Sequence, residues 1–355
     1  MVQKSIKKDK FKNYYGSLIF MFLLITITFY LLFKDTSITS LIPVINTINP
    51  IYLFIAFSMM CLFIIFEAYV IYIILKNLNI KVPFKKCIGY SFIGFYFSAI
   101  TPSSSGGQPA QVYYMKKDNI NISYSSLTLL IIAIVYQSVM LLYGLLMYLF
   151  KYSFIINNIS GIKWLLIYGV MINVFIIGFI FAAIFSKNLV GKFIKFIVEL
   201  LSKFKIIKNT EYTLSKIDVH LDEYTNGANY IKNNPLLIVK VLIVTVLQIT
   251  AMYLVPYFIY KSFGLSTYSI IDVLSIQALL TIAVSSLPLP GAVGASESSF
   301  MILFKIFFSK ELLLSAMLLS RVISFYAFLL LSSIITIIIH IKVNSRHKIQ
   351  HNHLY

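Results

Sequence analysis

Long apolar runs alternate with short basic segments along the chain. Six of these runs reach the length of about 17–25 residues or more that a helix needs to cross a bilayer. They lie at residues 16–33, 50–75, 124–150, 163–186, 236–260 and 312–340. Two further apolar regions, 84–117 and 270–309, are interrupted by proline, glycine and serine. The pattern predicts an all-α polytopic membrane protein with about six full spans and two broken segments.

The positions of lysine and arginine predict how the chain is oriented in the membrane. We take the tail 1–15 as cytoplasmic and let each broken segment enter and leave on one side. The cytoplasmic side then carries 23 of the 30 basic residues and the outer side six, while Arg321 lies within the membrane. Region 84–117 becomes a re-entrant hairpin from the cytoplasm, and 270–309 one from outside. Both termini, including the tail 341–355, are predicted to be cytoplasmic in a plasma-membrane protein.

The two halves of the chain repeat one pattern of span, hairpin and span. The breaks near 104 and 290 are 186 positions apart, and the flanking spans show offsets of 186 and 188. The halves 50–150 and 236–340 therefore predict an inverted repeat within one integral membrane domain, residues 1–355. Broken segments at matching positions of inverted repeats are typical of transporters, whose sites lie near the midplane.

Composition narrows the class further. The chain is 59% hydrophobic and 12% charged, whereas soluble domains are about 45–50% apolar and about 25% charged. The net charge of +18 fits the positive-inside rule better than nucleic-acid binding. Both cysteines lie in apolar runs, and four of the five histidines crowd the C-terminal end. We expect no disulfide framework, metal or cofactor, and no motif of a nucleotide site or nucleophile elbow appears.

One long polar segment, 187–235, separates the halves. Its first part, 187–205, alternates lysines with an apolar stripe, which is typical of an amphipathic helix on an anionic cytoplasmic leaflet. We expect no catalytic domain in so short a segment.

The first break reads TPSSSGGQP and begins at Thr101. Irregular backbone at membrane depth is tolerated only inside protein or beside a water-filled cavity. Pro102 and Pro109 end helices, while Gly106 and Gly107 permit unusual dihedrals and close approach. Free N–H groups where the helix resumes, together with hydroxyls, suit a phosphate. The hydroxyls belong to Ser103, Ser104 and Ser105. A purely structural hairpin of small residues is the alternative.

The second break, PLPGAVGASE, has the same physical character. Pro288 and Pro290 end one half-helix, and Gly291 and Gly294 turn the chain. Glu297 falls in the first turn of the next half-helix, where a carboxylate favours the helix dipole. It is predicted to be either a site residue or a capping carboxylate.

Arg321 is the one arginine predicted within a span. A charge at that depth costs about 2.5–3.5 kcal/mol, so it should face the interior and have a partner. Glu67 is the other mid-span charge, which predicts a Glu67–Arg321 pair, either structural or releasable to a lipid phosphate. Gln137 and Gln248, also mid-span, are predicted to hydrogen-bond between helices.

The motifs TPSSSGGQPAQVYYMKK, LPLPGAVGASE and SRVISFY resemble the lysylphosphatidylglycerol synthase transmembrane region family. These flippase-like domains form the N-terminal part of the multiple peptide resistance factor and also stand alone. The resemblance covers about 15–340. It implies a role for Glu67, Gly106, Gly107, Pro109, Pro290, Gly291, Gly294, Glu297 and Arg321. Many relatives carry an acidic and a basic residue where Gln108 and Gln111 stand, which implies a different head-group selectivity.

The leading hypothesis is translocation of a lipid with a polar head group, such as lysyl-phosphatidylglycerol or a related phospholipid or polyprenyl lipid. The family name implies an alternative, phosphatidylglycerol lysyltransferase activity with resistance to cationic antimicrobial peptides, but no aminoacyltransferase domain is seen. A third hypothesis is an ion-coupled small-solute transporter. Expected partners are membrane phospholipids and a separate lipid-modifying enzyme. The predicted head-group site comprises Glu67, Ser103, Ser104, Ser105, Gly106, Gly107, Gln108, Pro109, Gln111, Pro290, Gly291, Gly294, Glu297 and Arg321.

Overall fold

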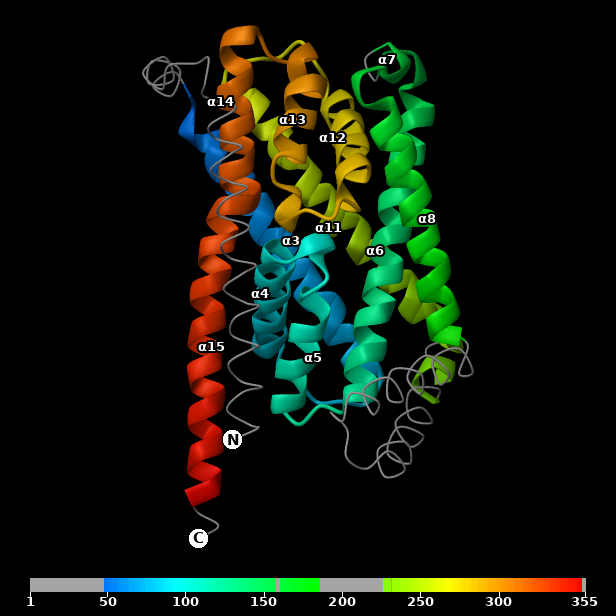
Figure 1. Cartoon of the computed structure of the whole chain (residues 1–355), viewed down its shortest axis with the longest axis vertical. Coiled ribbons are helices and arrows are strands. Elements are labelled where there is room, and N and C mark those ends of the chain that lie inside the picture. The colour runs from blue at the N-terminus through cyan, green and yellow to red at the C-terminus, as the bar shows by residue number, and fades with distance from the viewer. Residues whose placement is uncertain (1–47, 158–159, 186–225, 231, 353–355) are drawn as a thin grey trace, which may run out of the picture.

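The computed structural model describes residues 48–157, 160–185, 226–230 and 232–352, and every regular element among these residues is helical (Figure 1). The all-α prediction is confirmed. The predicted span 16–33 and the amphipathic segment 187–205 lie outside the described residues.

Five helical segments in the described part of the chain are long and apolar enough to cross a membrane. They confirm five of the predicted spans and make the protein a multi-pass membrane protein. Four are single helices: α3 (Pro50–Asn77), α6 (Ile122–Phe150), α8 (Lys163–Phe185) and α11 (Pro235–Ser262). The fifth is continuous through α14 (Lys310–Arg321), the π-helical turn η6 (Val322–Tyr326) and α15 (Ala327–Asn352).

Local sequence fixes where these helices begin. The side chain of Asn49 accepts a hydrogen bond from the N–H of Ile51, and Pro50 occupies the first turn of α3. The side chain of Asn121 caps α6 in the same way. Such caps satisfy backbone donors that the first turn leaves without helical partners. Proline suits the first turn because its missing N–H would be unpaired there anyway.

Each half of the chain contains one helical hairpin with a broken tip. The first hairpin comprises α4 (Phe84–Ile100), η2 (Pro102–Ser104) and α5 (Gly107–Lys117). The second comprises α12 (Ile270–Ser285), η4 (Pro290–Ala292) and α13 (Ala295–Leu303), with a short turn η5 (Phe304–Ile306) after it. In Figure 1 the first hairpin rises from below and the second descends from above, so that their tips meet near half height.

The two tips contact each other directly, since η2 packs against η4. The hydroxyl of Ser103 lies 3.5 Å from the carbonyl oxygen of Leu287 in the opposite tip. A buried apolar cluster also joins both hairpins to the last span: Ala99, Ile100, Val293, Phe325 and Leu329. The irregular backbone of both tips is thereby held by protein.

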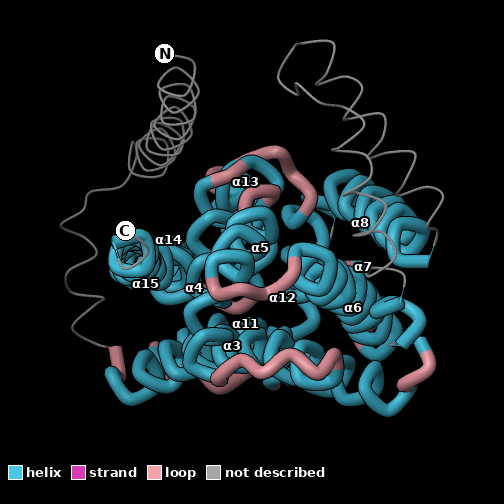
Figure 2. Tube along the Cα trace, turned by 90° about the horizontal axis from the view of Figure 1, so that it is seen from below, coloured by secondary structure: helices cyan, strands magenta, loops and turns pink. Residues whose placement is uncertain are grey.

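The halves pack reciprocally. The antiparallel helices α3 and α11 make the most extensive helix contact among the described residues. The arm α4 packs on α15 of the other half, and α12 packs on α6 of the first half. Figure 2 shows the hairpins between α14–α15 on one side and α6–α8 on the other. The opposed hairpins agree with an inverted repeat, while the boundaries of the repeats as units remain a prediction.

The glycines of the first tip matter because they lack a side chain, not because they adopt unusual backbone dihedrals. A Cβ on Gly107 would lie 2.1 Å from the Ser98 hydroxyl and 2.8 Å from the carbonyl oxygen of Gly94. The missing side chain therefore lets α5 approach α4. The left-handed positions of this tip are Ser103 (φ 49°) and Ser104 (φ 55°), so the prediction that glycine supplies the unusual dihedrals is wrong here.

We expect Gly107→Ala to lower the midpoint of thermal unfolding in detergent by several degrees, because the new methyl group overlaps backbone and side-chain atoms of α4. The matched control is Gly178→Ala on α8, where a Cβ meets nothing within 4 Å. Size-exclusion chromatography of heated samples measures both. Equal midpoints for the two variants would contradict this account of the tip.

Candidate functional site

A cavity of about 580 Å³ lies beside the two hairpin tips. Both hairpins contribute to its wall, together with α3, α6, α8 and α11. Because the tips meet near half height (Figure 1), the cavity lies near the middle of the helical bundle.

The wall of the cavity has polar and apolar parts. The hydrogen-bonding side chains are Glu67, Ser98, Ser103, Ser104, Ser105, Gln108, Gln111, Tyr136, Gln137, Gln248, Thr281 and Ser285. The large apolar side chains are Phe63, Phe95, Leu129, Ile132, Met140, Ile176, Ile180, Met252, Leu287, Leu289 and Phe325. Such a mixed wall matches an amphiphile better than a purely apolar ligand.

Gln111 and Glu67 anchor the polar part of the wall. The Gln111 amide nitrogen donates to Glu67 Oε1 at 3.1 Å and to the carbonyl oxygen of Tyr90 at 3.1 Å. Gly94 makes room for this amide, because a Cβ there would lie 2.4 Å from it. Glu67 thus pairs with Gln111 rather than with Arg321, so the predicted Glu67–Arg321 pair is wrong.

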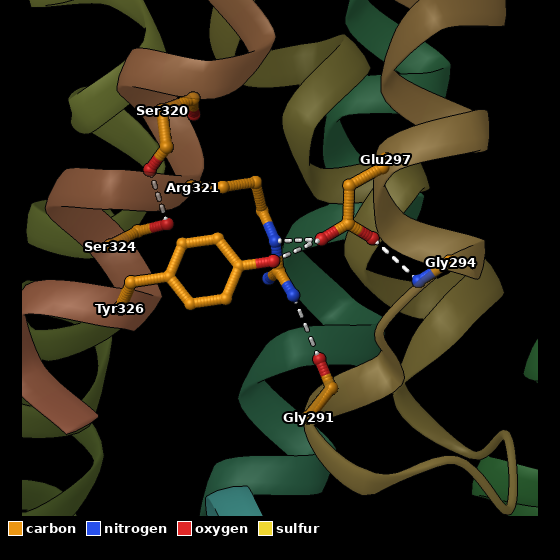
Figure 3. A network of polar contacts seen from close by, with 7 residues as sticks. All are labelled: Gly291, Gly294, Glu297, Ser320, Arg321, Ser324 and Tyr326. Atoms are coloured by element: carbon orange, nitrogen blue, oxygen red, sulfur yellow. Dashed lines mark hydrogen bonds and ion pairs between the residues drawn. The ribbon is translucent and has the colours of Figure 1, made fainter. Parts of the chain in front are cut away.

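Arg321 instead forms an ion pair with Glu297 of the second hairpin (Figure 3). Its Nε donates to Glu297 Oε1 at 2.7 Å, and a terminal nitrogen donates to the carbonyl oxygen of Gly291 at 3.1 Å. The other carboxylate oxygen of Glu297 accepts the N–H of Gly294 at 2.7 Å. Tyr326 donates its hydroxyl to Glu297 Oε1 at 3.3 Å. Glu297 therefore both caps α13 and neutralises the partly buried guanidinium of Arg321.

The aromatic turn after Arg321 completes this arrangement. The guanidinium carbon lies 4.5 Å from the ring centre of Phe325, a favourable cation–π distance. Phe325 and Gly291 line the cavity, whereas Arg321 and Glu297 do not. Arg321 consequently acts on the cavity wall through the two groups it holds. The π-helical geometry of 322–326 turns Phe325 toward the second tip, and such turns often occur at functional sites.

The backbone donors that precede α5 are used within the first tip, while the predicted phosphate cradle, which concerns the N–H groups at the start of α5 and the serine hydroxyls, stays a prediction. The N–H of Ser104 donates to the carbonyl oxygen of Thr101, and that of Ser105 to the carbonyl oxygen of Pro102. The N–H of Gly106 donates to the Thr101 hydroxyl at 2.8 Å. Three backbone donors that could have faced an anion are thus used within the tip.

The structure divides the predicted site residues into two groups. Those that line the cavity are Glu67, Ser103, Ser104, Ser105, Gln108, Gln111 and Gly291. Those that shape the hairpin tips without lining it are Gly106, Gly107, Pro109, Pro290, Gly294, Glu297 and Arg321.

Sequence reasoning missed several polar residues of the wall. It did not single out Ser98, Tyr136, Thr281 or Ser285, and it assigned Gln137 and Gln248 to contacts between helices. The available signal was the presence of polar side chains within apolar spans, which alone does not distinguish a cavity wall from a helix contact.

The sequence comparisons agree with this architecture. The family model described as "Lysylphosphatidylglycerol synthase TM region" matches residues 17–332. The chain belongs to this family. It is also 25% identical over 296 residues to UPF0104 membrane protein PH1989 of Pyrococcus horikoshii, covering 81% of this chain and 86% of that protein. The resemblance drawn from the two broken motifs is confirmed.

We expect Arg321→Ala to destabilise the folded protein by about 3–5 kcal/mol, because it leaves the Glu297 carboxylate buried without its cation. Glu297→Ala should have a similar cost. The double variant should be less destabilised than the sum of the two, because neither charge is then stranded. The free energies of unfolding of the wild type, the two single variants and the double variant are measured in mixed micelles. Strictly additive effects of the two substitutions would contradict the pairing.

Proposed function

We propose that this protein translocates a lipid with a polar head group from one leaflet to the other. The observation that carries the proposal is the cavity at the hairpin tips, whose lining combines polar and large apolar side chains. Its polar side chains suit a head group, and its large apolar side chains, which include Ile176 and Ile180 of α8, suit the first part of an acyl chain.

The exposure of the first tip supports a lipid rather than a fully enclosed solute. Ser103, Ser104, Ser105 and Gln108 are exposed on the described protein surface, although the tip lies at half height. Polar groups that contact hydrocarbon without a hydrogen-bond partner are unfavourable. Water or a head group entering from the side would satisfy them, while the acyl chains stay in the bilayer.

The opposed hairpins supply a mechanism for alternating access. In transporters with inverted repeats, the two halves exchange conformations around a central site. Here the cavity lies beside both tips, and the second tip is fixed by the contacts that Arg321 makes with Glu297 and Gly291. Rocking of one hairpin against the other would move the opening from one side of the tips to the other.

The family description suggests lysyl-phosphatidylglycerol or a related phospholipid as a head group to test. We place the protein in the plasma membrane with both termini cytoplasmic, on the basis of its lysine and arginine distribution. An ion-coupled transporter of a soluble solute would need a site closed to lipid. The combination of polar and large apolar side chains in the cavity lining favours the lipid proposal.

A translocation assay tests the proposal directly. Purified protein is reconstituted in vesicles that contain trace acyl-labelled lipids, and reduction by dithionite reports the label that has crossed. We expect the wild type to accelerate crossing of at least one lipid. Ala133→Phe should slow it about tenfold or more, because Ala133 lines the cavity and an aromatic ring would occupy it.

The matched control is Gly178→Phe, which adds the same ring to α8 where a Cβ meets no other atom. It should transport like the wild type. Equal rates for wild type, Ala133→Phe and protein-free vesicles would contradict the proposed function, provided that both variants elute as the wild type does on size-exclusion chromatography.

A further inference from the structure

We infer that the cavity receives an uncharged, hydroxyl-rich head group, such as the sugar of a glycosyl-diacylglycerol. This inference rests on the proposed function and narrows its substrate class. It comes from a comparison of the two hairpin tips, whose backbones match from Thr101 to Ser103 and from Leu289 to Gly291 but whose side chains differ.

The backbone defines which residues of the two tips correspond. Thr101 (φ −114°, ψ 146°) matches Leu289 (φ −114°, ψ 133°), and Ser103 (φ 49°, ψ 29°) matches Gly291 (φ 58°, ψ 15°). Each pair is 188 positions apart. The starts of α5 and α13, and those of α6 and α14, are also 188 positions apart.

This offset identifies the first-half counterparts of the buried ion pair. Pro109 corresponds to Glu297, and Ala133 corresponds to Arg321. Where the second half has a carboxylate and a guanidinium, the first half therefore has two small uncharged residues. Ala133 lines the cavity. The cavity in the first half therefore corresponds to the space that the Arg321 side chain fills in the second half.

Amides and hydroxyls surround this space. The amides of Gln108, Gln111, Gln137 and Gln248 all line it. An amide or a hydroxyl can both donate and accept, as can a sugar hydroxyl. The Gln137 side-chain oxygen is buried and has no hydrogen-bond partner, and Ser285 and Thr281 hydroxyls lie in the same wall. A buried acceptor without a partner is costly, and a ligand hydroxyl would satisfy it once the Gln137 side chain turns toward the cavity.

Charged head groups fit the wall less well. The described lining residues include no lysine or arginine, and Arg321 is engaged by Glu297 and Gly291. A phosphate would be desolvated there without a cation. An ammonium offers donors but no acceptor, so the amide N–H groups would lack partners. The single carboxylate of the wall, Glu67, accepts from Gln111 through Oε1, and an ammonium paired with its other oxygen would still offer no acceptor to the amide N–H groups of the wall.

The experiment compares three acyl-labelled lipids in the same proteoliposomes: monoglucosyl-diacylglycerol, phosphatidylglycerol and lysyl-phosphatidylglycerol. We expect the glucolipid to cross about tenfold faster than either charged lipid, since a site built for hydroxyls discriminates strongly against ligands that leave its polar groups unpaired. The variant Gln137→Leu with Gln248→Leu should lose about tenfold of the glucolipid rate and little of the other two.

Asn77→Leu is the matched control, because the Asn77 amide lies at the end of α3 outside the cavity lining and donates to the carbonyl oxygen of Ile73 in its own helix. It should keep the selectivity of the wild type, and thermal unfolding verifies that all variants are folded. Equal or faster crossing of phosphatidylglycerol or lysyl-phosphatidylglycerol would overturn this inference and leave the proposed function standing. If none of the three lipids crosses faster than in protein-free vesicles, both are overturned.

Discussion

The fold depends on one constraint: backbone polar groups at membrane depth need partners. Both hairpins break their helices there, and each tip meets the requirement with its own atoms. The first uses Thr101, whose hydroxyl accepts the N–H of Gly106 at 2.8 Å. The second uses Glu297, which accepts the N–H of Gly294 at 2.7 Å. The tips then cover each other, so that irregular backbone becomes the floor of a cavity.

The different capping groups make the halves functionally unequal. A carboxylate cap in the second tip requires a cation, and Arg321 supplies it while stacking on Phe325. A neutral hydroxyl cap in the first tip requires none, and Ala133 stands where the arginine would be. The second half is therefore held together by the ion pair of Glu297 and Arg321, and the first half leaves room for a ligand. The asymmetry links local capping chemistry to the place of the cavity.

Much of this could be predicted from the sequence. Proline and glycine in apolar regions revealed both hairpins, and apolar length revealed the spans. The partner of Arg321 was mispredicted, because two charges distant in sequence carry no signal of which helix faces which. The sequence predicts an offset of 186 at the breaks, whereas the offset in the structure grows from 185 at the starts of α3 and α11 to 188 at the tips. Differences of a few residues in loops hid the correspondence of Ala133 with Arg321.

The most direct test of the central claim is the chemical accessibility of the first tip. A Ser104→Cys variant is prepared without Cys61 and Cys87, and is treated in vesicles with a charged, membrane-impermeant maleimide. A thiol reacts as its thiolate, which requires water. The account predicts labelling at Ser104→Cys and none at Gly178→Cys on α8. Reaction of Ser104→Cys with a lipid-soluble maleimide alone would contradict a hydrated opening at the tip.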